Sequence, residues 1–293
     1  MNKIWMALAL FLVLVGPARA DVPRVVVDIA PVGGLVASVM GELGAPDVIV
    51  SPGASPHDFS LRPSQARALS EADVVIWIGP GLTPWLERSL AALSGGAAQL
   101  ELLHEAGTHL LPVRGDDGDH DHGHDHGEHD PHAWLDPDNA VSWLTAIAET
   151  LSAVDPGNAP IYAANAAAAQ ARLSVLAKEI AVQVAGARFI TFHDGYQYFE
   201  ARFAVPAVGV VSPSDEHDPS AQDVAHAREV LADAPVPCLL MGPEGNRRVA
   251  KTVLEGFETR IVPVDPLGHG IVVDADHYGS VLRGIATALQ GCR

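Results

Sequence analysis

Three histidines and one aspartate stand at positions where polar side chains can act on a ligand. Each follows a predicted strand or precedes a predicted helix: His57, His132, His193 and Asp265. Two come from each half of the chain, so they can converge at a boundary between the halves. Three imidazoles and one carboxylate form a borderline-soft tetrahedral set, which suits zinc best, with nitrogen ligands at about 2.0–2.1 Å. A single histidine at a strand end is more commonly a capping residue, so the prediction depends on their joint placement.

A second group of histidines lies in residues 115–130, which read GDDGDHDHGHDHGEHD. This segment holds no side chain that gains from burial, so it is predicted to be a mobile surface loop. Neutral imidazoles helped by carboxylates favour loose, exchangeable metal binding. The secondary metal ligands predicted here are His120, His122, His124, His126 and His129. The alternative is a solvated acidic linker without a function.

The elements that must position these residues follow an alternating pattern of strands and helices. Apolar, β-branched runs predict strands at Val25–Ile29, Val48–Val50, Val74–Ile78, Ala98–Leu102, Arg188–Phe192, Ala207–Val211, Cys238–Met241 and Arg260–Val264. Helical patterns separate them, and an Ala-rich helix from Pro160 to about Ala185 joins the two halves. Continuous apolar strands between helices favour parallel sheets covered on both faces. The predicted fold is therefore α/β, with two lobes, each a mainly parallel sheet flanked by helices, joined by one long rigid linking helix.

The expected organisation has four parts. Residues 1–20 read as a signal peptide, because a basic start precedes the apolar run Ile4–Val15 and the small-x-small site Ala18-Arg19-Ala20. The first lobe is expected at 21–156, the linking helix at 157–186 and the second lobe at 187–293. No cysteine follows the cleavage site, so a lipid anchor is not expected, and the predicted location is the periplasm.

The charge balance narrows the possible partners. The chain of 293 residues has 36 acidic and 18 basic side chains, a formal net charge of -18. A surface with so few cations cannot neutralise the phosphates of a nucleic acid. It also argues against an anionic membrane surface as the partner.

The two cysteines are Cys238 and Cys292. An even number of cysteines in an exported chain favours a disulfide. Two free thiols, or a metal site that uses cysteine, are the alternatives.

Four motifs in order resemble those of the metal-specific solute-binding proteins of bacterial ABC importers, the zinc/manganese group called cluster A-I. They are His-Asp-Phe-Ser-Leu-Arg-Pro-Ser at 57–64, Asp-Pro-His-Ala-Trp-Leu-Asp-Pro at 130–137, Phe-His-Asp-Gly-Tyr-Gln-Tyr-Phe at 192–199 and Asp-Pro-Leu-Gly at 265–268. The resemblance covers essentially the whole mature chain. It implies a non-enzymatic monomer that binds one metal through His57, His132, His193 and Asp265. It further implies delivery to a membrane permease, with a periplasmic zinc chaperone as a further partner.

The resemblance also favours zinc over manganese. Manganese-type relatives generally have a carboxylate where this chain has His193, and manganese prefers oxygen-rich sites. The acidic His-rich loop and the two cysteine positions are similar to those of zinc-type members. Pro56 stands where some zinc-type relatives have a glutamate, so Asp265 or a water must complete the shell. The stretch 241–245 departs from the acidic-Pro-Gln pattern of relatives.

Other functions remain as alternatives. A periplasmic zinc buffer or metallochaperone would act mainly through the His-rich loop. A manganese-binding member or an adhesin would share the fold. An exported zinc hydrolase is disfavoured, because the chain has no His-Glu-x-x-His motif and no evident general base beside the ligands. Asp58 and Asp194, next to two of the histidines, are the expected partners that orient the imidazoles.

Overall fold

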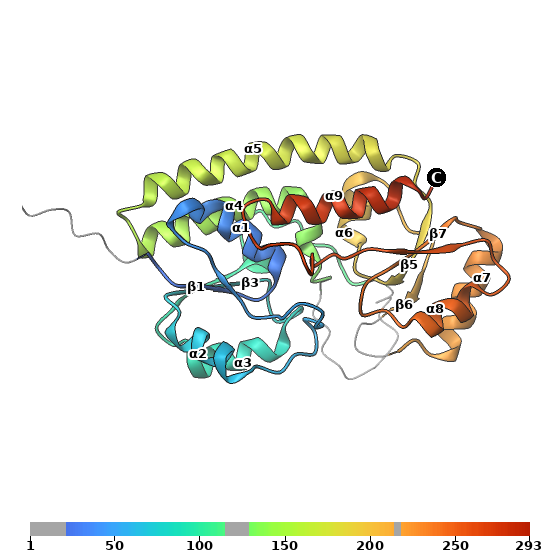
Figure 1. Cartoon of the computed structure of the whole chain (residues 1–293), viewed down its shortest axis with the longest axis horizontal. Coiled ribbons are helices and arrows are strands. Elements are labelled where there is room, and N and C mark those ends of the chain that lie inside the picture. The colour runs from blue at the N-terminus through green and yellow to red at the C-terminus, as the bar shows by residue number, and fades with distance from the viewer. Residues whose placement is uncertain (1–21, 115–128, 214–217) are drawn as a thin grey trace, which may run out of the picture.

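The computed structural model describes residues 22–114, 129–213 and 218–293. Two four-stranded parallel sheets form its two lobes (Figure 1). The first sheet has the order β2-β1-β3-β4 and the second β6-β5-β7-β8. The strands are β1 (Val25–Val27), β2 (Asp47–Val48), β3 (Val74–Trp77), β4 (Ala98–Glu101), β5 (Phe189–His193), β6 (Val210–Ser212), β7 (Cys238–Met241) and β8 (Arg260–Pro263). The predicted two-lobed α/β fold is confirmed.

The helices connect the strands and cover both faces of each sheet. They are α1 (Ala30–Met40), α2 (Pro63–Glu71), α3 (Pro84–Leu93), α4 (Pro137–Val154), α5 (Ala159–Val184), α6 (Gln197–Phe203), α7 (Ala221–Asp233), α8 (Arg247–Leu254) and α9 (His277–Gln290). Among the described residues, no helix has the length and apolar character needed to cross a membrane.

Alternation along the strands divides the apolar side chains among three cores. Val26 and Val75 point to a core beneath α2 and α3, whereas their neighbours Val25 and Val74 point to the opposite face. The second sheet is divided in the same way, with its outer core beneath α7 and α8. The inner faces of both sheets share one continuous core with α1, α4, α5 and α9. A wide separation of the lobes would therefore expose a common apolar core to water.

The long helix α5 runs along the top of both lobes (Figure 1). It has 26 residues, from Ala159 to Val184, which matches the predicted linking helix. Its buried residues include Leu173, Leu176 and Ile180, which belong to the shared core. The last helix, α9, packs on both α1 and α5, so the C-terminal segment also contacts the first lobe. Two helices thus fix the lobes relative to each other.

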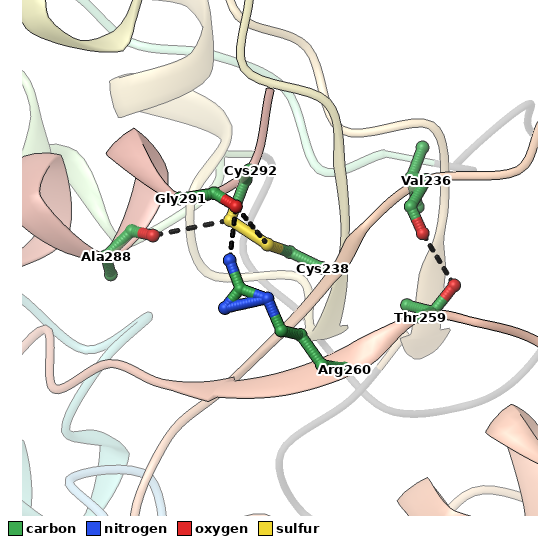
Figure 2. Close-up of a disulfide and its surroundings, with 7 residues drawn as sticks. All are labelled: Val236, Cys238, Thr259, Arg260, Ala288, Gly291 and Cys292. Atoms are coloured by element: carbon green, nitrogen blue, oxygen red, sulfur yellow. Dashed lines mark hydrogen bonds between the residues drawn. A yellow bond between two sulfur atoms is a disulfide. The ribbon is translucent and has the colours of Figure 1, made fainter.

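The predicted disulfide between Cys238 and Cys292 is confirmed. It ties β7 to Cys292, the second residue after the end of α9 (Figure 2). Both cysteines are fully buried, and the main chain of Cys292 also accepts a hydrogen bond from the Arg188 amide. Arg260 of β8 donates to the Gly291 carbonyl beside the bridge. The C-terminal residues Gly291 and Cys292 are therefore fixed to the second lobe.

Removing the disulfide should lower stability without removing the fold's ligand site. The bridge closes a separation of 54 residues, and such a loop is worth about 4 kcal/mol in the chain-entropy account. We expect the double variant Cys238→Ser/Cys292→Ser to lose up to this amount in urea unfolding. Metal affinity should be unchanged. Equal unfolding midpoints for the variant and the oxidised wild type would contradict this expectation.

A buried carboxyl group joins the ends of β1 and β3. Asp28 is fully buried and accepts hydrogen bonds from the amides of Ile29, at 2.7 Å, and Ile78, at 2.8 Å. Burial raises the pKa of Asp28 to about 7, although both amides act to lower it. This group therefore keeps its proton in the native state at pH values where the unfolded chain has lost it.

The titration of Asp28 should make stability fall as pH rises. The carboxyl group of the unfolded chain releases its proton near its ordinary pKa of 3.8, and the native carboxyl group releases it near 7. Between these values unfolding releases a proton, so the unfolding free energy drops by up to about 1.4 kcal/mol per pH unit. Asp28→Asn lacks this titration. Urea unfolding of both proteins over this window should show the variant gaining relative to wild type as pH rises, and a constant difference would refute the assignment.

Candidate metal centre

Three histidines from three separate segments meet between the lobes. His57 lies in the loop between β2 and α2, and His132 lies just before α4. His193 is the last residue of β5 in the second sheet. Each offers a ring nitrogen, and these atoms all lie within 4.8 Å of one another. Among the described residues, this is the one group of three or more such side chains that could hold a metal ion.

The loop that carries His57 is fixed by contacts with α2 and α3. Gln65 donates to the Ile49 carbonyl at 2.7 Å and accepts from the Arg62 amide at 2.7 Å. Trp85 of α3 donates its indole N–H to the Pro56 carbonyl at 2.7 Å, one residue before His57. The loop between β2 and α2 therefore holds its histidine on a hydrogen-bonded frame.

A buried carboxylate orients His132. Oδ1 of Asp130 lies 2.7 Å from Nδ1 of the His132 ring and accepts the His132 amide at 2.9 Å. An ionised carboxylate can only accept, so Nδ1 carries the proton and Nε2 keeps its lone pair for a metal. Both residues are buried, with 4% and 7% exposure. The ring is further packed against Trp134, at 5.2 Å between centroids.

The distances between the imidazoles suit a single small cation. Nε2 of His132 lies 3.2 Å from Nε2 of His193. Two nitrogen ligands of a tetrahedral zinc ion lie about 3.3 Å apart, given bonds of about 2.0–2.1 Å. The cavity beside these nitrogens has a volume of about 30 Å³. A space of this size fits an ion, whereas organic ligands need pockets of roughly 300–1,000 Å³.

Hydrogen bonds between the lobes hold the segment that carries His132. Tyr198 of α6 donates to the Asp130 carbonyl at 2.9 Å. Arg202 of α6 forms a bidentate pair with Asp136, at 2.7 and 3.0 Å. Asp136 in turn caps the first turn of α4. The segment of the first lobe between 130 and 136 is thus fastened to the first helix of the second lobe.

A charged cluster lies next to the histidines. Arg114 pairs with Glu200 at 2.8 Å and lies 3.5 Å from Asp194. Burial raises the pKa of Asp194, while Arg114, His193 and His132 act to lower it. Burial also raises the pKa of Glu200, against the effect of Arg114. Asp194 is therefore close enough to the rings of His193 and His132 to interact with their charge, and the expectation that it orients an imidazole stays a prediction.

The structure places the other predicted residues differently. Asp58 is exposed, and it is Asp130, two residues before His132, that bonds an imidazole. The signal for Asp130 was its place in the Asp-Pro-His motif. Of the predicted loop ligands, His129 pairs through its main chain with Pro112, and His120, His122, His124 and His126 lie outside the described residues.

Asp265 is not part of the cluster formed by His57, His132 and His193. Its Oδ1 accepts from the amides of Leu267, at 3.0 Å, and Gly268, at 2.9 Å, within its own loop. The same oxygen lies 3.3 Å from Nδ1 of His269. Burial acts to raise the pKa of Asp265, but the ring and amide of His269 and the amide of Leu267 outweigh it and lower the pKa. The carboxylate is thus engaged by its own loop.

Known proteins are similar to this chain over nearly its whole length. The family model described as "Zinc-uptake complex component A periplasmic" matches residues 25–292. The "High-affinity zinc uptake system protein ZnuA" of Paracoccus denitrificans (strain Pd 1222) is 41% identical, over 94% of this chain and 93% of the relative. A solved structure described as "Crystal structure of ZnuA" has a TM-score of 0.79 at 25% identity, covering 93% of this chain and 99% of that one.

The same fold occurs with other metals. The solute-binding protein FpvC from Pseudomonas aeruginosa, solved in complex with Mn²⁺, has a TM-score of 0.78 at 21% identity. It covers 92% of this chain and 99% of that one. A likeness at this identity reports the fold alone, so the choice of metal has to be argued from the ligands.

The Asp130–His132 contact should contribute to metal affinity. Asp130→Asn keeps an acceptor but removes the charge that raises the basicity of the imidazole. Loss of such a partner typically costs about 10–100-fold in metal affinity, and we expect the lower end of this range. Asp58→Asn is the matched control, because Asp58 is exposed. Chelator competition with zinc measures both, and equal losses in the two variants would contradict the role of Asp130.

Proposed function

The chain belongs to the family of periplasmic components A of zinc-uptake complexes, and we propose that it captures zinc in the periplasm with high affinity and delivers it to the permease of an ABC importer. The observation that carries this proposal is the convergence of His57, His132 and His193 within 4.8 Å. A solute-binding protein needs a site that is selective for one solute and that releases it again. Imidazoles from both lobes meet this need, because a small shift of one lobe changes the ligand geometry.

The ligand types favour zinc as the solute. Three nitrogen ligands and at most one oxygen make a site for a borderline-soft ion with tetrahedral geometry. Manganese prefers more oxygen ligands and a higher coordination number. The names of the relatives also refer to zinc uptake. We therefore place manganese binding second.

The route of export and the partners are part of the same proposal. Residues 1–20 act as a cleavable signal peptide, and the mature protein works as a monomer that docks on the permease. The lobes extend over 21–156 and 187–293, with 157–186 as the linking helix. Because both lobes share one core, we expect only small lobe motions on binding, which the permease reads as a change of the loops around the three histidines.

The His-rich loop takes a secondary role in this account. Its composition suits several weak zinc equivalents, which raise the local supply of zinc near the site. Asp130 is the last residue of this segment, and its carboxylate is hydrogen-bonded to the His132 ring. The loop therefore ends beside the three clustered histidines. A periplasmic chaperone could also deliver zinc there. A zinc buffer that acts mainly through the loop is the second candidate, and it predicts that the three clustered histidines are dispensable.

A hydrolase fits the arrangement less well. A catalytic zinc needs an open coordination position and a nearby general base. The cavity of about 30 Å³ has no room for an organic substrate beside the metal. We therefore propose that the protein binds and releases its metal without catalysis.

The central test removes one imidazole and the loop separately. Deletion of residues 115–128, which keeps Asp130, should leave one tight zinc equivalent and remove weaker ones. His193→Ala should abolish the tight equivalent, because two imidazoles remain of three. Chelator competition with Zn²⁺ and then Mn²⁺ measures both. In the host lacking this gene, zinc-limited growth should be restored by the loop-deleted protein and not by His193→Ala.

The control is His104→Ala, since His104 is an exposed histidine outside the site. It should bind zinc as the wild type does. If His193→Ala keeps tight zinc binding while the loop deletion loses it, the buffer alternative replaces the importer proposal.

A further inference from the structure

We propose that Glu244 supplies the oxygen ligand that completes the zinc shell, an inference that rests on the function proposed above. Glu244 lies between β7 and α8. Its carboxylate would be the fourth ligand of the zinc ion, for which the sequence offered Asp265 or a water.

Glu244 borders the cavity of the three histidines. The wall combines His57, His132 and His193 with Trp134, Leu267 and Glu244, and Glu244 is the one acidic residue among the described residues that line it. Three neutral imidazoles leave the full charge of a bound dication uncompensated. Buried charges are stable when an opposite charge pairs with them. The carboxylate in the wall is therefore the group that can offset the charge of the ion.

Asp265 is a poorer source of this oxygen. It borders a separate hollow, together with Arg247 and Pro263. Its Oδ1 is already held by the amides of Leu267 and Gly268 and by His269. Moving the carboxylate toward the metal would disturb these hydrogen bonds, which costs free energy.

Gly242 provides a resting place for the Glu244 carboxylate. A Cβ atom added at Gly242 would overlap Oε1 and Cδ of Glu244, so the carboxylate lies over the glycine where another residue would have its side chain. The carboxylate is also near enough to His269 to help raise the pKa of that imidazole. In this position Glu244 is not within 4.8 Å of all three ligand nitrogens. Rotation about its side-chain bonds, from the resting place toward the cavity that it borders, is the step that would add it to the shell.

The test compares carboxylate-to-amide variants in the protein that lacks residues 115–128. Glu244→Gln should weaken zinc binding by at least about tenfold, and up to about 100-fold, in chelator competition. Asp265→Asn should stay close to the wild-type affinity. The matched control is Glu255→Gln, because Glu255 is exposed at the end of α8. Co²⁺ gives a second readout, since replacing a charged ligand by a neutral one should change its visible absorption bands in Glu244→Gln alone.

A second variant keeps the carboxylate and removes its resting place. Gly242 has no positive φ, so Gly242→Ala is compatible with the backbone. It should tighten zinc binding several-fold in a chain with Glu244 and have no effect in the Glu244→Gln background, a coupling that a double-mutant cycle measures. An effect of Gly242→Ala that persists without Glu244 would overturn the inference.

The outcomes separate this inference from the proposed function. Wild-type zinc affinity and an unchanged Co²⁺ spectrum in Glu244→Gln, with the tight site lost in His193→Ala, would overturn the role of Glu244 and leave the importer proposal standing. A loss in Asp265→Asn alone would assign the oxygen to Asp265. Tight zinc binding retained in His193→Ala would overturn the site itself, and the inference with it.

Discussion

Nitrogen ligands of one zinc ion must lie about 3.3 Å apart, and here that short distance spans the boundary between two lobes. Nε2 of His132 and Nε2 of His193 lie 3.2 Å apart although 61 residues separate them in sequence. A metal bond tolerates errors of only about 0.2 Å. The rest of the structure has to hold the lobes to that precision while allowing the ion to leave.

The frame meets this constraint by joining the lobes through one core and a few buried polar contacts. The shared core with α5 and α9 fixes the overall position of the sheets. Nearer the site, the bidentate pair of Arg202 with Asp136 and the Tyr198 hydroxyl fix the segment that carries His132. Charged, bidentate contacts of this kind specify geometry more than they add stability. The loop of His57 belongs to the first lobe and is held separately, through Trp85 and Gln65.

The features of the fold that depend on periodicity and on position along the chain could be predicted from the sequence. Apolar strands alternating with helices specified the parallel sheets, and the Ala-rich run specified α5. The rule that sites lie at the carboxyl ends of parallel strands led to His193, the last residue of β5. Strand ends were less well placed: the strand expected at Ala207–Val211 is Val210–Ser212, because pairing with β5 decides its limits more than its apolar run does.

Contacts between distant residues could not be derived in this way. Asp130 belongs to the Asp-Pro-His motif, but nothing in the sequence says which way its side chain points. The pairing of Arg114 with Glu200 joins residues 86 positions apart, and no local pattern connects them. Glu244 lies in the wall of the cavity because the fold places the loop after β7 beside the three histidines. This proximity is not visible in the sequence. The engagement of Asp265 by its own loop is likewise a tertiary result.

The most direct test of the account is zinc K-edge X-ray absorption of the protein without residues 115–128, loaded with one zinc equivalent. We expect three imidazole ligands with nitrogen at about 2.0–2.1 Å, together with one oxygen ligand at about 2.0–2.2 Å. Multiple scattering from the imidazole rings gives their number independently of affinity. A spectrum with one or no imidazole, or with five or six oxygen ligands, would contradict the claim that His57, His132 and His193 together hold the metal.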